Sequence, residues 1–367
     1  MASVVSATAP KPLRPRPGQS RAPEWLLLGS STALVLAFLG TAELGLRAAA
    51  PDDFVGPEAM ERLHRRSEAY GWEPRPGFAA RIEGMRTTIN DRGWRGPEPE
   101  WDAAPRRVMM LGDSIAFGWG VHDEETFAAL LDADEGTSVL NLAVEGYGID
   151  QALLRFESEG LAQRPHVVVL SFCVANDFVD TALPAFLYDG STPKPYFRVE
   201  DSGLRLYDGH LRRPMRERAV SGLEERFELF RWIRERRNRV PESSAASAPH
   251  WVDVARQVME RRAEVVELTL RLLERLAAQA GSAGASLVLL VHPKQRTYGP
   301  EQRARADGIE DELMRSDRLR DVTVVDLRQR YRERGLAFRD VSLDRIGHLS
   351  PAGHREVADV MRGLLTP

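Results

Sequence analysis

The sequence predicts an α/β protein built on a mainly parallel sheet of five strands, with a layer of helices on each face. Two observations support this fold class. From Arg107 onward, short apolar runs alternate with helical stretches, which is typical of three-layer α/β proteins. Polar residues follow several of these runs, at the positions where open α/β sheets form their sites.

The first strand is expected at residues 108–111, where four apolar residues follow one another. Continuous apolar runs are typical of strands that are buried on both faces, as in parallel sheets. The other strands are expected at residues 138–142, 167–172, 287–291 and 322–327.

Helices are expected between the strands, at residues 125–131, 150–161 and 251–280. The third is the longest, and its apolar residues recur at helical spacing, which predicts one buried face. Ser350-Pro351 predicts the start of a last helix, because serine caps helices and proline suits their first turn.

Between residues 178 and 250 the alternation stops, and the chain is rich in proline, glycine, tyrosine and arginine. We interpret this stretch as an insertion into a domain at residues 106–365, placed where it can shape substrate access. The run from Arg231 to Arg239 has two interpretations. We favour a solvated helix face, and the alternative is a binding site for an anionic polymer or for phospholipid headgroups.

The amino-terminal region predicts a membrane segment. Residues 1–23 are rich in proline, alanine and basic residues and indicate a disordered tail. Residues 24–47 form the expected anchor, and from Trp25 to Leu46 a helix would measure about 33 Å, enough to cross a bilayer. Residues 51–105 are expected to be an irregular lead-in rather than a separate domain.

Charges flanking this segment predict its orientation. Basic residues precede it and acidic residues follow it, so the positive-inside rule predicts a single pass with a cytoplasmic tail and an extracytoplasmic domain. The alternative is a signal peptide cleaved near Ala48-Ala49-Ala50, which would release a secreted domain.

Composition excludes several classes of protein. The net charge of −4 and the pI near 6.1 give no indication of nucleic-acid binding. Cys173 is the only cysteine, so no intrachain disulfide can form, and we expect a buried thiol. No phosphate loop, dinucleotide motif or metal-ligand spacing is found, so neither a cofactor nor a metal is expected. The oligomeric state is not predicted.

The most informative motif is Gly112-Asp113-Ser114, directly after the first predicted strand. A turn at this place presents the serine hydroxyl at the carboxyl edge of the sheet. A serine hydroxyl is a weak nucleophile until a base accepts its proton. The spacing is not that of the Gly-x-Ser-x-Gly elbow, which argues against an ordinary α/β-hydrolase.

Four ordered blocks within residues 106–365 resemble those of the SGNH hydrolases, also called GDSL esterases. The first is Gly112-Asp113-Ser114-Ile115, and the second runs from Asn141 to Gly148. The third is Val174-Ala175-Asn176-Asp177, and the last runs from Asp344 to His354. The lead-in and the membrane run are similar to those of anchored bacterial members. The resemblance implies a flavodoxin-like sheet and acyl transfer through a covalent serine ester.

The resemblance also implies the roles of the site residues. Ser114 would be the nucleophile and His348 the base, with Asp344 as the third member. The oxyanion donors would be the backbone N–H groups of Ser114 and Gly146 and the side-chain amide of Asn176. The family usually places its acid two or three residues before the histidine, whereas Asp344 lies four before it.

This spacing leaves three alternatives for the acid. The loop bulges so that Asp344 reaches His348, or another acid such as Asp340 takes its place, or the enzyme works with a serine–histidine dyad. His354 and His292 are expected outside the site.

The sequence therefore predicts a membrane-anchored serine esterase. Its expected substrate is an ester, by preference a carbohydrate O-acyl ester, such as acetyl, on an envelope polysaccharide. The alternatives are a lipid acylhydrolase, an O-acyltransferase that uses the same serine, or a catalytically silent envelope binding or assembly protein.

Overall fold

The structure is a computed structural model that describes residues 24–49, 52–238, 250–293, 308–344 and 346–365. The predicted disordered tail and the predicted linker at 241–249 lie outside the described residues. The chain divides into two compact units. One comprises residues 1–50 and 220–240, and the other comprises residues 51–219 and 241–367.

The larger unit is built on one parallel sheet of five strands. These are β6 (Arg106–Gly112), β7 (Thr137–Asn141), β8 (Val167–Cys173), β11 (Ser286–His292) and β12 (Thr323–Asp326). Their order is β12-β11-β8-β6-β7, and every neighbouring pair is parallel. Counted along the chain this order is 2-1-3-4-5, that of a flavodoxin-like sheet. All five predicted strands are confirmed, with ends that differ by at most two residues.

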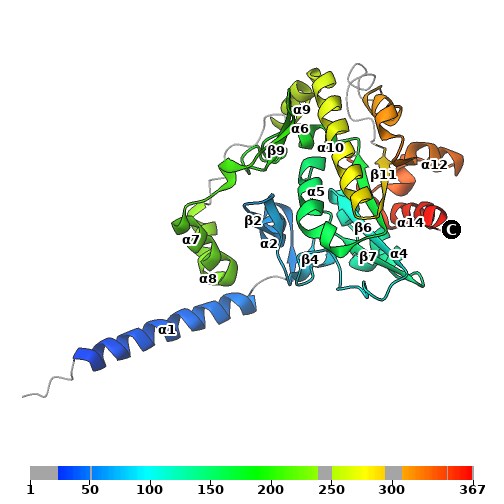
Figure 1. Cartoon of the computed structure of the whole chain (residues 1–367). Coiled ribbons are helices and arrows are strands. Elements are labelled where there is room, and N and C mark those ends of the chain that lie inside the picture. The colour runs from blue at the N-terminus through cyan, green and yellow to red at the C-terminus, as the bar shows by residue number, and fades with distance from the viewer. Residues whose placement is uncertain (1–23, 50–51, 239–249, 294–307, 345, 366–367) are drawn as a thin grey trace, which may run out of the picture. The chain divides into compact units, whose positions relative to one another are not determined.

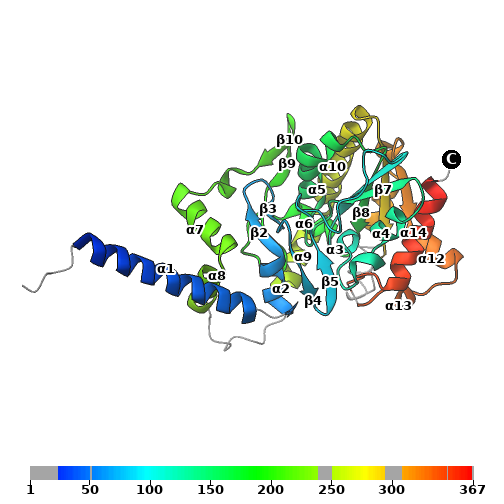
Figure 2. The ribbon, with the colours of Figure 1, turned by 90° about the horizontal axis from the view of Figure 1, so that it is seen from below.

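Side chains alternate between two apolar layers, one on each face of the sheet. Met109 and Leu111 of β6 pack with α5 (Ile149–Arg155) and α10 (Arg262–Ser282). Val108 and Met110 pack on the other face with α4 (Phe127–Asp132), α12 (Leu327–Glu333) and α14 (Pro351–Leu365). Figures 1 and 2 show the sheet between these two sets of helices.

Two of the predicted helices are divided. The stretch at 251–280 forms α9 (His250–Glu260) and α10, which are separated at Arg261, where the backbone leaves helical geometry at φ −92° and ψ 38°. The stretch at 150–161 forms α5 and a wider π turn at Phe156–Gly160. Neither break contains a proline, and the apolar pattern continues through both. The sequence therefore predicted one continuous helix in each case. Ser350 caps α14 as predicted, since its hydroxyl accepts the N–H of Gly353 at 3.2 Å.

The lead-in at 51–105 is more regular than the sequence predicts. It contains α2 (Gly56–Leu63) and the strands β1 (Asp53–Phe54), β2 (His64–Ser67), β3 (Gly71–Pro74), β4 (Ala79–Ile82) and β5 (Met85–Thr88). The expectation of an irregular segment was therefore wrong. The strands were missed because they have only two to four residues, which is too short to show an apolar alternation.

The insertion at 178–250 also contains regular elements. The helix α6 (Asp177–Ala182) leads into it, and the hairpin of β9 (Tyr196–Glu200) and β10 (Gly203–Tyr207) follows. The helices α7 (Met215–Arg226) and α8 (Glu228–Asn238) come next. A fully buried ion pair between Lys194 and Asp150 joins the insertion to the amino end of α5. A further short helix, α13 (Phe338–Val341), precedes the loop that leads to α14.

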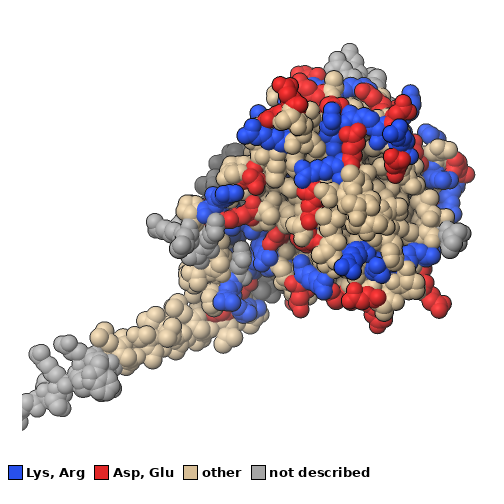
Figure 3. All heavy atoms as spheres, viewed as in Figure 1, with Lys and Arg blue, Asp and Glu red and all other residues tan. Residues whose placement is uncertain are grey.

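The predicted membrane segment is the helix α1 (Glu24–Ala49). Its portion Leu28–Ala49 is long and apolar enough to cross a bilayer, and none of it is buried in the protein. Figure 3 shows the described part of this helix as a surface with almost no charged side chains. Such a helix could be a membrane anchor or a signal sequence.

Candidate active site

The strand β6 carries Ser114 to the carboxyl edge of the sheet. Gly112 ends the strand at φ 137°, and a Cβ there would lie 2.6 Å from the backbone oxygen of Ser171. Asp113 caps the short helix α3 (Ser114–Phe117), because its Oδ1 accepts the N–H of Ile115 at 2.9 Å. Strand order reverses between β6 and β8, so Ser114 lies at the switch point where open α/β sheets bind ligands.

His348 lies directly against this serine. Its Nε2 is 3.0 Å from Oγ of Ser114, although 234 residues separate the two. The loop that carries His348 is closed by a bridge between Ser342 and Leu349, and by the N–H of Leu343, which donates to the His348 carbonyl at 2.7 Å. His348 is therefore positioned by a short hairpin-like closure just before α14.

Asp344 completes the chain of hydrogen bonds. Its Oδ2 lies 2.6 Å from Nδ1 of His348. Its Oδ1 accepts backbone N–H groups from Ile346 and Gly347 at 2.9 Å each and from His348 at 3.2 Å. The four-residue spacing is therefore accommodated by a loop that folds around the carboxylate. Asp340, by contrast, accepts the N–H of Ala337 and caps α13.

The environment of Asp344 keeps this carboxylate ionised. Partial burial by itself would raise its pKa. The hydrogen bond and positive charge of His348, together with the backbone N–H groups, outweigh burial and lower the pKa to about 2. A carboxylate that is charged at neutral pH can orient the imidazole and stabilise its protonated form.

The loop that carries Gly146 runs beside the end of β6. The N–H of Val144 donates to the carbonyl of Gly112 at 3.1 Å, which brings the loop toward Ser114. Gly146 has φ +72°, and a Cβ there would lie 2.2 Å from the ring of Phe186. The sequence gave no reason to single out Phe186, because it lies in the irregular insertion.

Asn176 lies between β8 and α6, at the same edge of the sheet. Its Nδ2 donates to Oδ2 of Asp180 at 2.7 Å and to Oδ2 of Asp113 at 3.2 Å. Its Oδ1 is buried, with no hydrogen-bond partner among the described residues. In this arrangement both amide N–H bonds are directed at carboxylates. For the predicted oxyanion role, one of these N–H groups has to leave its carboxylate and donate to the oxyanion instead.

These acids form a buried cluster beneath the site. Burial raises the pKa of Asp113, that of Asp177 and that of Asp180, the last to about 7. Mutual repulsion raises the pKa of Asp177 further, and the hydrogen bond from Asn176 and the charge of Lys194 partly offset burial at Asp180. Asp180 therefore gains or loses its proton near neutral pH. Asp180 was not singled out from the sequence, although it follows Asn176 by one helical turn.

Comparison with known proteins gives the family. The model of the GDSL-like lipase/acylhydrolase family matches residues 110–356, which is more than half of the chain. The chain belongs to this family. The matched stretch contains Ser114, Gly146, Asn176, Asp344 and His348. The protein is thus a hydrolase that acts on ester bonds.

Two solved structures are similar to this chain at low identity. A catalytic mutant of an acetylxylan esterase from Geobacillus stearothermophilus is 14% identical, with 73% of this chain and 97% of that chain covered and a TM-score of 0.40. A protein from Desulfitobacterium hafniense, described as lipolytic and of the G-D-S-L family, is 12% identical, with 71% and 99% covered and a TM-score of 0.39. No curated protein matches the chain.

Two buried histidines of this GDSL-family enzyme form no hydrogen bond with Ser114 in the described part of the chain. His354 is fully buried, and its Nδ1 accepts the N–H of Phe127 at 3.1 Å. His292 ends β11 and is 1% exposed. Burial lowers the pKa of each ring to about 3. At His354 the charges of His292 and Arg95 add slightly to this lowering of the pKa. Both rings are neutral at physiological pH and belong to the core.

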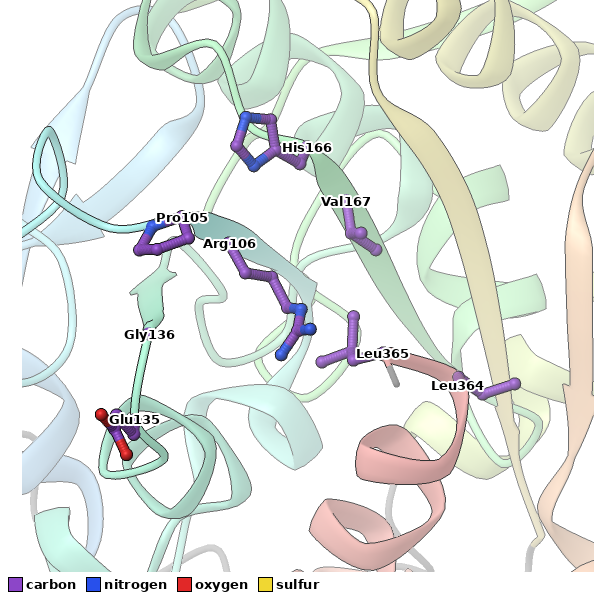
Figure 4. A pocket seen from close by; sticks show the side chains of 8 residues that line it. All are labelled: Pro105, Arg106, Glu135, Gly136, His166, Val167, Leu364 and Leu365. Carbon is purple, nitrogen blue, oxygen red and sulfur yellow. The ribbon is translucent and has the colours of Figure 1, made fainter. Parts of the chain in front are cut away.

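The opposite edge of the sheet has a hollow of about 590 Å³. Figure 4 shows it at the amino ends of β6 and β8, lined by Pro105, Arg106, Glu135, Gly136, His166, Val167, Leu364 and Leu365. Ser114 follows the other end of β6, so the sheet separates this hollow from the candidate site. Within the described part of the chain, no group of three or more His, Cys, Asp and Glu side chains could hold a metal ion.

Proposed function

We propose that this GDSL-family hydrolase is a serine esterase that works through a covalent acyl-serine. The observation that carries the proposal is the continuous hydrogen-bond chain from Ser114 Oγ through His348 to Asp344, with links of 3.0 and 2.6 Å. Such a chain supplies the three parts that acyl transfer needs, a nucleophile, a base and an orienting carboxylate.

The proposed reaction has two halves. His348 Nε2 accepts the proton of Ser114 as Oγ attacks the ester carbonyl carbon and forms a tetrahedral intermediate. His348 then gives this proton to the leaving alcohol oxygen as the carbon–oxygen bond breaks, which leaves an acyl-serine. Water attacks the acyl-serine by the same route, releases the carboxylic acid and restores the Ser114 hydroxyl. Asp344 stabilises the imidazolium that forms in each half.

The oxyanion would be stabilised by backbone N–H groups of Ser114 and Gly146 and by the amide of Asn176. A donor of this kind contributes about 3 kcal/mol to transition-state stability in other enzymes. Asn176 would give up its longer hydrogen bond, the one to Asp113 at 3.2 Å, and keep that to Asp180 at 2.7 Å. The shorter bond would then hold the amide in position.

We further propose a carbohydrate O-acyl ester as the substrate. A row of aromatic rings supports this choice, because it starts at Gly146 with Phe186 and continues through Tyr188 to Trp251 at centroid distances of 5.5 and 5.7 Å. Tyr188 is 41% exposed. Flat aromatic faces pack against the C–H faces of sugar rings, whereas a long acyl chain favours an apolar tunnel.

For location, we propose a single-pass membrane protein with the tail in the cytoplasm and the hydrolase domain outside. The apolar portion Leu28–Ala49 and the flanking charges support this proposal. Cleavage after the helix would instead give a secreted enzyme, and mass determination of the mature chain distinguishes the two.

A fluorophosphonate probe tests the mechanism on the full chain in mild detergent. We expect the wild type to be labelled and to release acetate from acetylated oligosaccharides, and we expect Ser114→Ala and His348→Ala to do neither. Undiminished turnover by a folded Ser114→Ala variant would refute the proposal. A folded wild type that neither reacts with the probe nor turns over any ester would instead indicate a silent binding protein.

The substrate class has its own test. Tyr188→Ala should raise KM for an acetylated oligosaccharide and leave the hydrolysis of p-nitrophenyl acetate unchanged. If the same variant weakens the hydrolysis of phospholipids but not that of acetylated sugars, the lipid acylhydrolase becomes the better assignment.

A further inference from the structure

The helix α8 is attached at its first turn to a charged residue of α1. Glu43 accepts the backbone N–H of Glu228 at 3.0 Å and that of Leu229 at 2.9 Å. These N–H groups lack partners within the helix, so the carboxylate caps α8. Arg47 donates to Glu43 at 2.7 Å and to the carbonyl of Arg226 at 3.0 Å. Two charged residues of α1 therefore hold the junction between the end of α7 and the start of α8.

The position of Glu43 along α1 determines the level at which α8 begins. Residues 25–42 carry no charge, and as a helix they measure about 27 Å, close to the thickness of the hydrocarbon layer of a bilayer. Glu43 is the first charged residue after this stretch, where the hydrocarbon layer would end. If α1 spans a membrane as proposed above, the capped end of α8 lies at the level of the lipid headgroups.

One side of α8 exposes large apolar side chains. Phe230, Trp232 and Ile233 are 39%, 40% and 48% exposed, and Phe230 and Ile233 lie nearly one turn apart. The guanidinium of Arg236 lies 4.6 Å from the ring of Trp232. Isolated apolar residues are common on surfaces, but three on one short helix form a patch that marks an interaction site.

The basic residues of α8 do not all form a solvated face. Arg231 is 7% exposed, and it pairs with Glu228. The interpretation of this run as a solvated helix face was therefore wrong at Arg231. Overall α8 has four arginines and two glutamates, so it combines a net positive charge with exposed tryptophan and aliphatic side chains. This combination is typical of helices that lie in the plane of a membrane surface.

We propose that α8 lies in the headgroup layer of an anionic phospholipid bilayer, beside the end of α1. Trp232, Ile233 and Phe230 reach below the phosphates, and Arg236 lies at their level. This inference rests on the proposed membrane anchorage of α1. A polyanionic polysaccharide would be attracted by the arginines, but it would gain nothing from the exposed Ile233 and Phe230.

Nitroxide labels on introduced cysteines test the proposal in the full chain, because the native Cys173 is buried. The labelled variants are Ile233→Cys in α8, Leu36→Cys in α1 and Glu333→Cys in α12, reconstituted in phosphatidylglycerol nanodiscs. The readout is the ratio of collisions with oxygen, which concentrates in lipid, to those with a water-soluble nickel complex. We expect a ratio at position 233 severalfold above that at position 333 and below that at position 36.

The three positions separate failure of the inference from failure of the anchor. A water-like ratio at position 36 would contradict the proposed anchorage, and the inference would fall with it. A lipid-like ratio at 36 with a water-like ratio at 233 would overturn the inference alone. Immobilisation of the label at 233 by soluble dextran sulfate, with a water-like ratio in nanodiscs, would assign this face to a polysaccharide and also overturn it.

A second comparison tests the role of charge. Replacing phosphatidylglycerol by phosphatidylcholine should lower the ratio at position 233, because the bilayer then loses its net negative charge. The ratio at position 36 should stay the same, since α1 is held by its apolar length. An equal ratio at 233 in both lipids would contradict the preference for an anionic surface.

Discussion

His64 and Glu145 lie 2.8 Å apart, Nε2 to Oε2, and their side chains are only 7% and 5% exposed. This contact joins the lead-in to the residue just before Gly146, 81 positions further along the chain. A second contact supports it, because Trp72 Nε1 donates to the Glu145 carbonyl at 2.9 Å. The lead-in therefore supports the loop that is proposed to hold the oxyanion, and it is more than a spacer after the apolar helix α1.

Replacing His64 by Ala should weaken both the fold and the reaction. The change leaves the Glu145 carboxylate buried without this partner, which costs about 1–3 kcal/mol in unfolding free energy. We expect kcat to fall more than KM rises, since the loop at Gly146 loses its support. Urea unfolding and ester hydrolysis measure the two effects. Glu145→Gln, which keeps a hydrogen-bonding side chain, should cost less, and an equal loss would contradict this explanation.

Asp344→Asn should lower kcat with little change in KM, because the amide no longer stabilises imidazolium. Loss of the equivalent carboxylate costs up to about 10⁴ in rate in serine proteases. The matched control is Asp340→Asn, which alters the cap of α13 and should leave kcat near that of the wild type. A large loss in the control, with none at position 344, would return the role to Asp340.

Acid should remove a contribution of Asp344 to stability. Its pKa of about 2 in the folded protein lies below the ordinary value of 3.8. The contribution is therefore complete above about pH 4 and is lost as the pH falls from about 4 to 2. Urea unfolding at several pH values should show a shallower decline over this range for Asp344→Asn than for the wild type.

Asp180→Asn should alter the pH dependence of stability in the opposite direction. The folded-state pKa of Asp180 is raised from 3.8 to about 7, so the folded protein holds this proton more tightly than the unfolded chain. Stability from this proton is therefore complete below about pH 4 and is lost as the pH rises to about 7. Relative to the wild type, the variant should gain of order 2 kcal/mol between pH 5 and pH 8. Parallel profiles would contradict the raised pKa.

Gly146→Ala should destabilise the protein for two separable reasons. An alanine at φ +72° is strained by about 1–2 kcal/mol, and its Cβ would overlap the ring of Phe186. Gly284→Ala is a matched control, because Gly284 has φ +77° but no atom within 4 Å of the added Cβ. The extra loss at position 146 measures the overlap, and adding Phe186→Ala should remove it. Thermal unfolding of these three variants, together with Phe186→Ala alone, tests this additivity.

Lys194→Met should cost about 3–5 kcal/mol in unfolding free energy, because it leaves the buried Asp150 without its cation. The double variant Lys194→Met with Asp150→Leu should recover most of this loss, since no buried charge remains. Chemical unfolding of the two variants measures the difference. If the double variant is less stable than the single one, the charge pair is not the dominant interaction at this place.

The parts of the fold that were predicted from sequence are those with continuous patterns. Five apolar runs predicted five strands, because strands buried on both faces must be apolar throughout. The residues of the candidate site were predicted from short motifs at strand ends. The structure brings Ser114, His348 and Asp344 together. The spacing of Asp344 could not be resolved from sequence, since it depends on how backbone N–H groups fold the loop around the carboxylate.

Other features of the structure have no recognisable pattern in the amino-acid sequence. The break at Arg261 interrupts a helix without proline or glycine, and the strands of the lead-in are too short for an alternation to be seen. Phe186 reaches Gly146 from the insertion, a contact that depends on tertiary packing alone. The hydrogen bonds between Asn176 and the buried acids likewise arise from chain segments that only the fold brings together.

The single thiol of the chain has a practical consequence. Cys173 is completely buried, and burial, with the nearby Asp113 and Asp177, raises its pKa well above the ordinary value. It is therefore inert toward maleimides while the protein is folded. The sequence therefore already serves as a silent background for cysteine scanning. A cysteine placed at Asp52 and treated with an impermeant maleimide in intact cells tests the proposed extracytoplasmic position of the hydrolase domain.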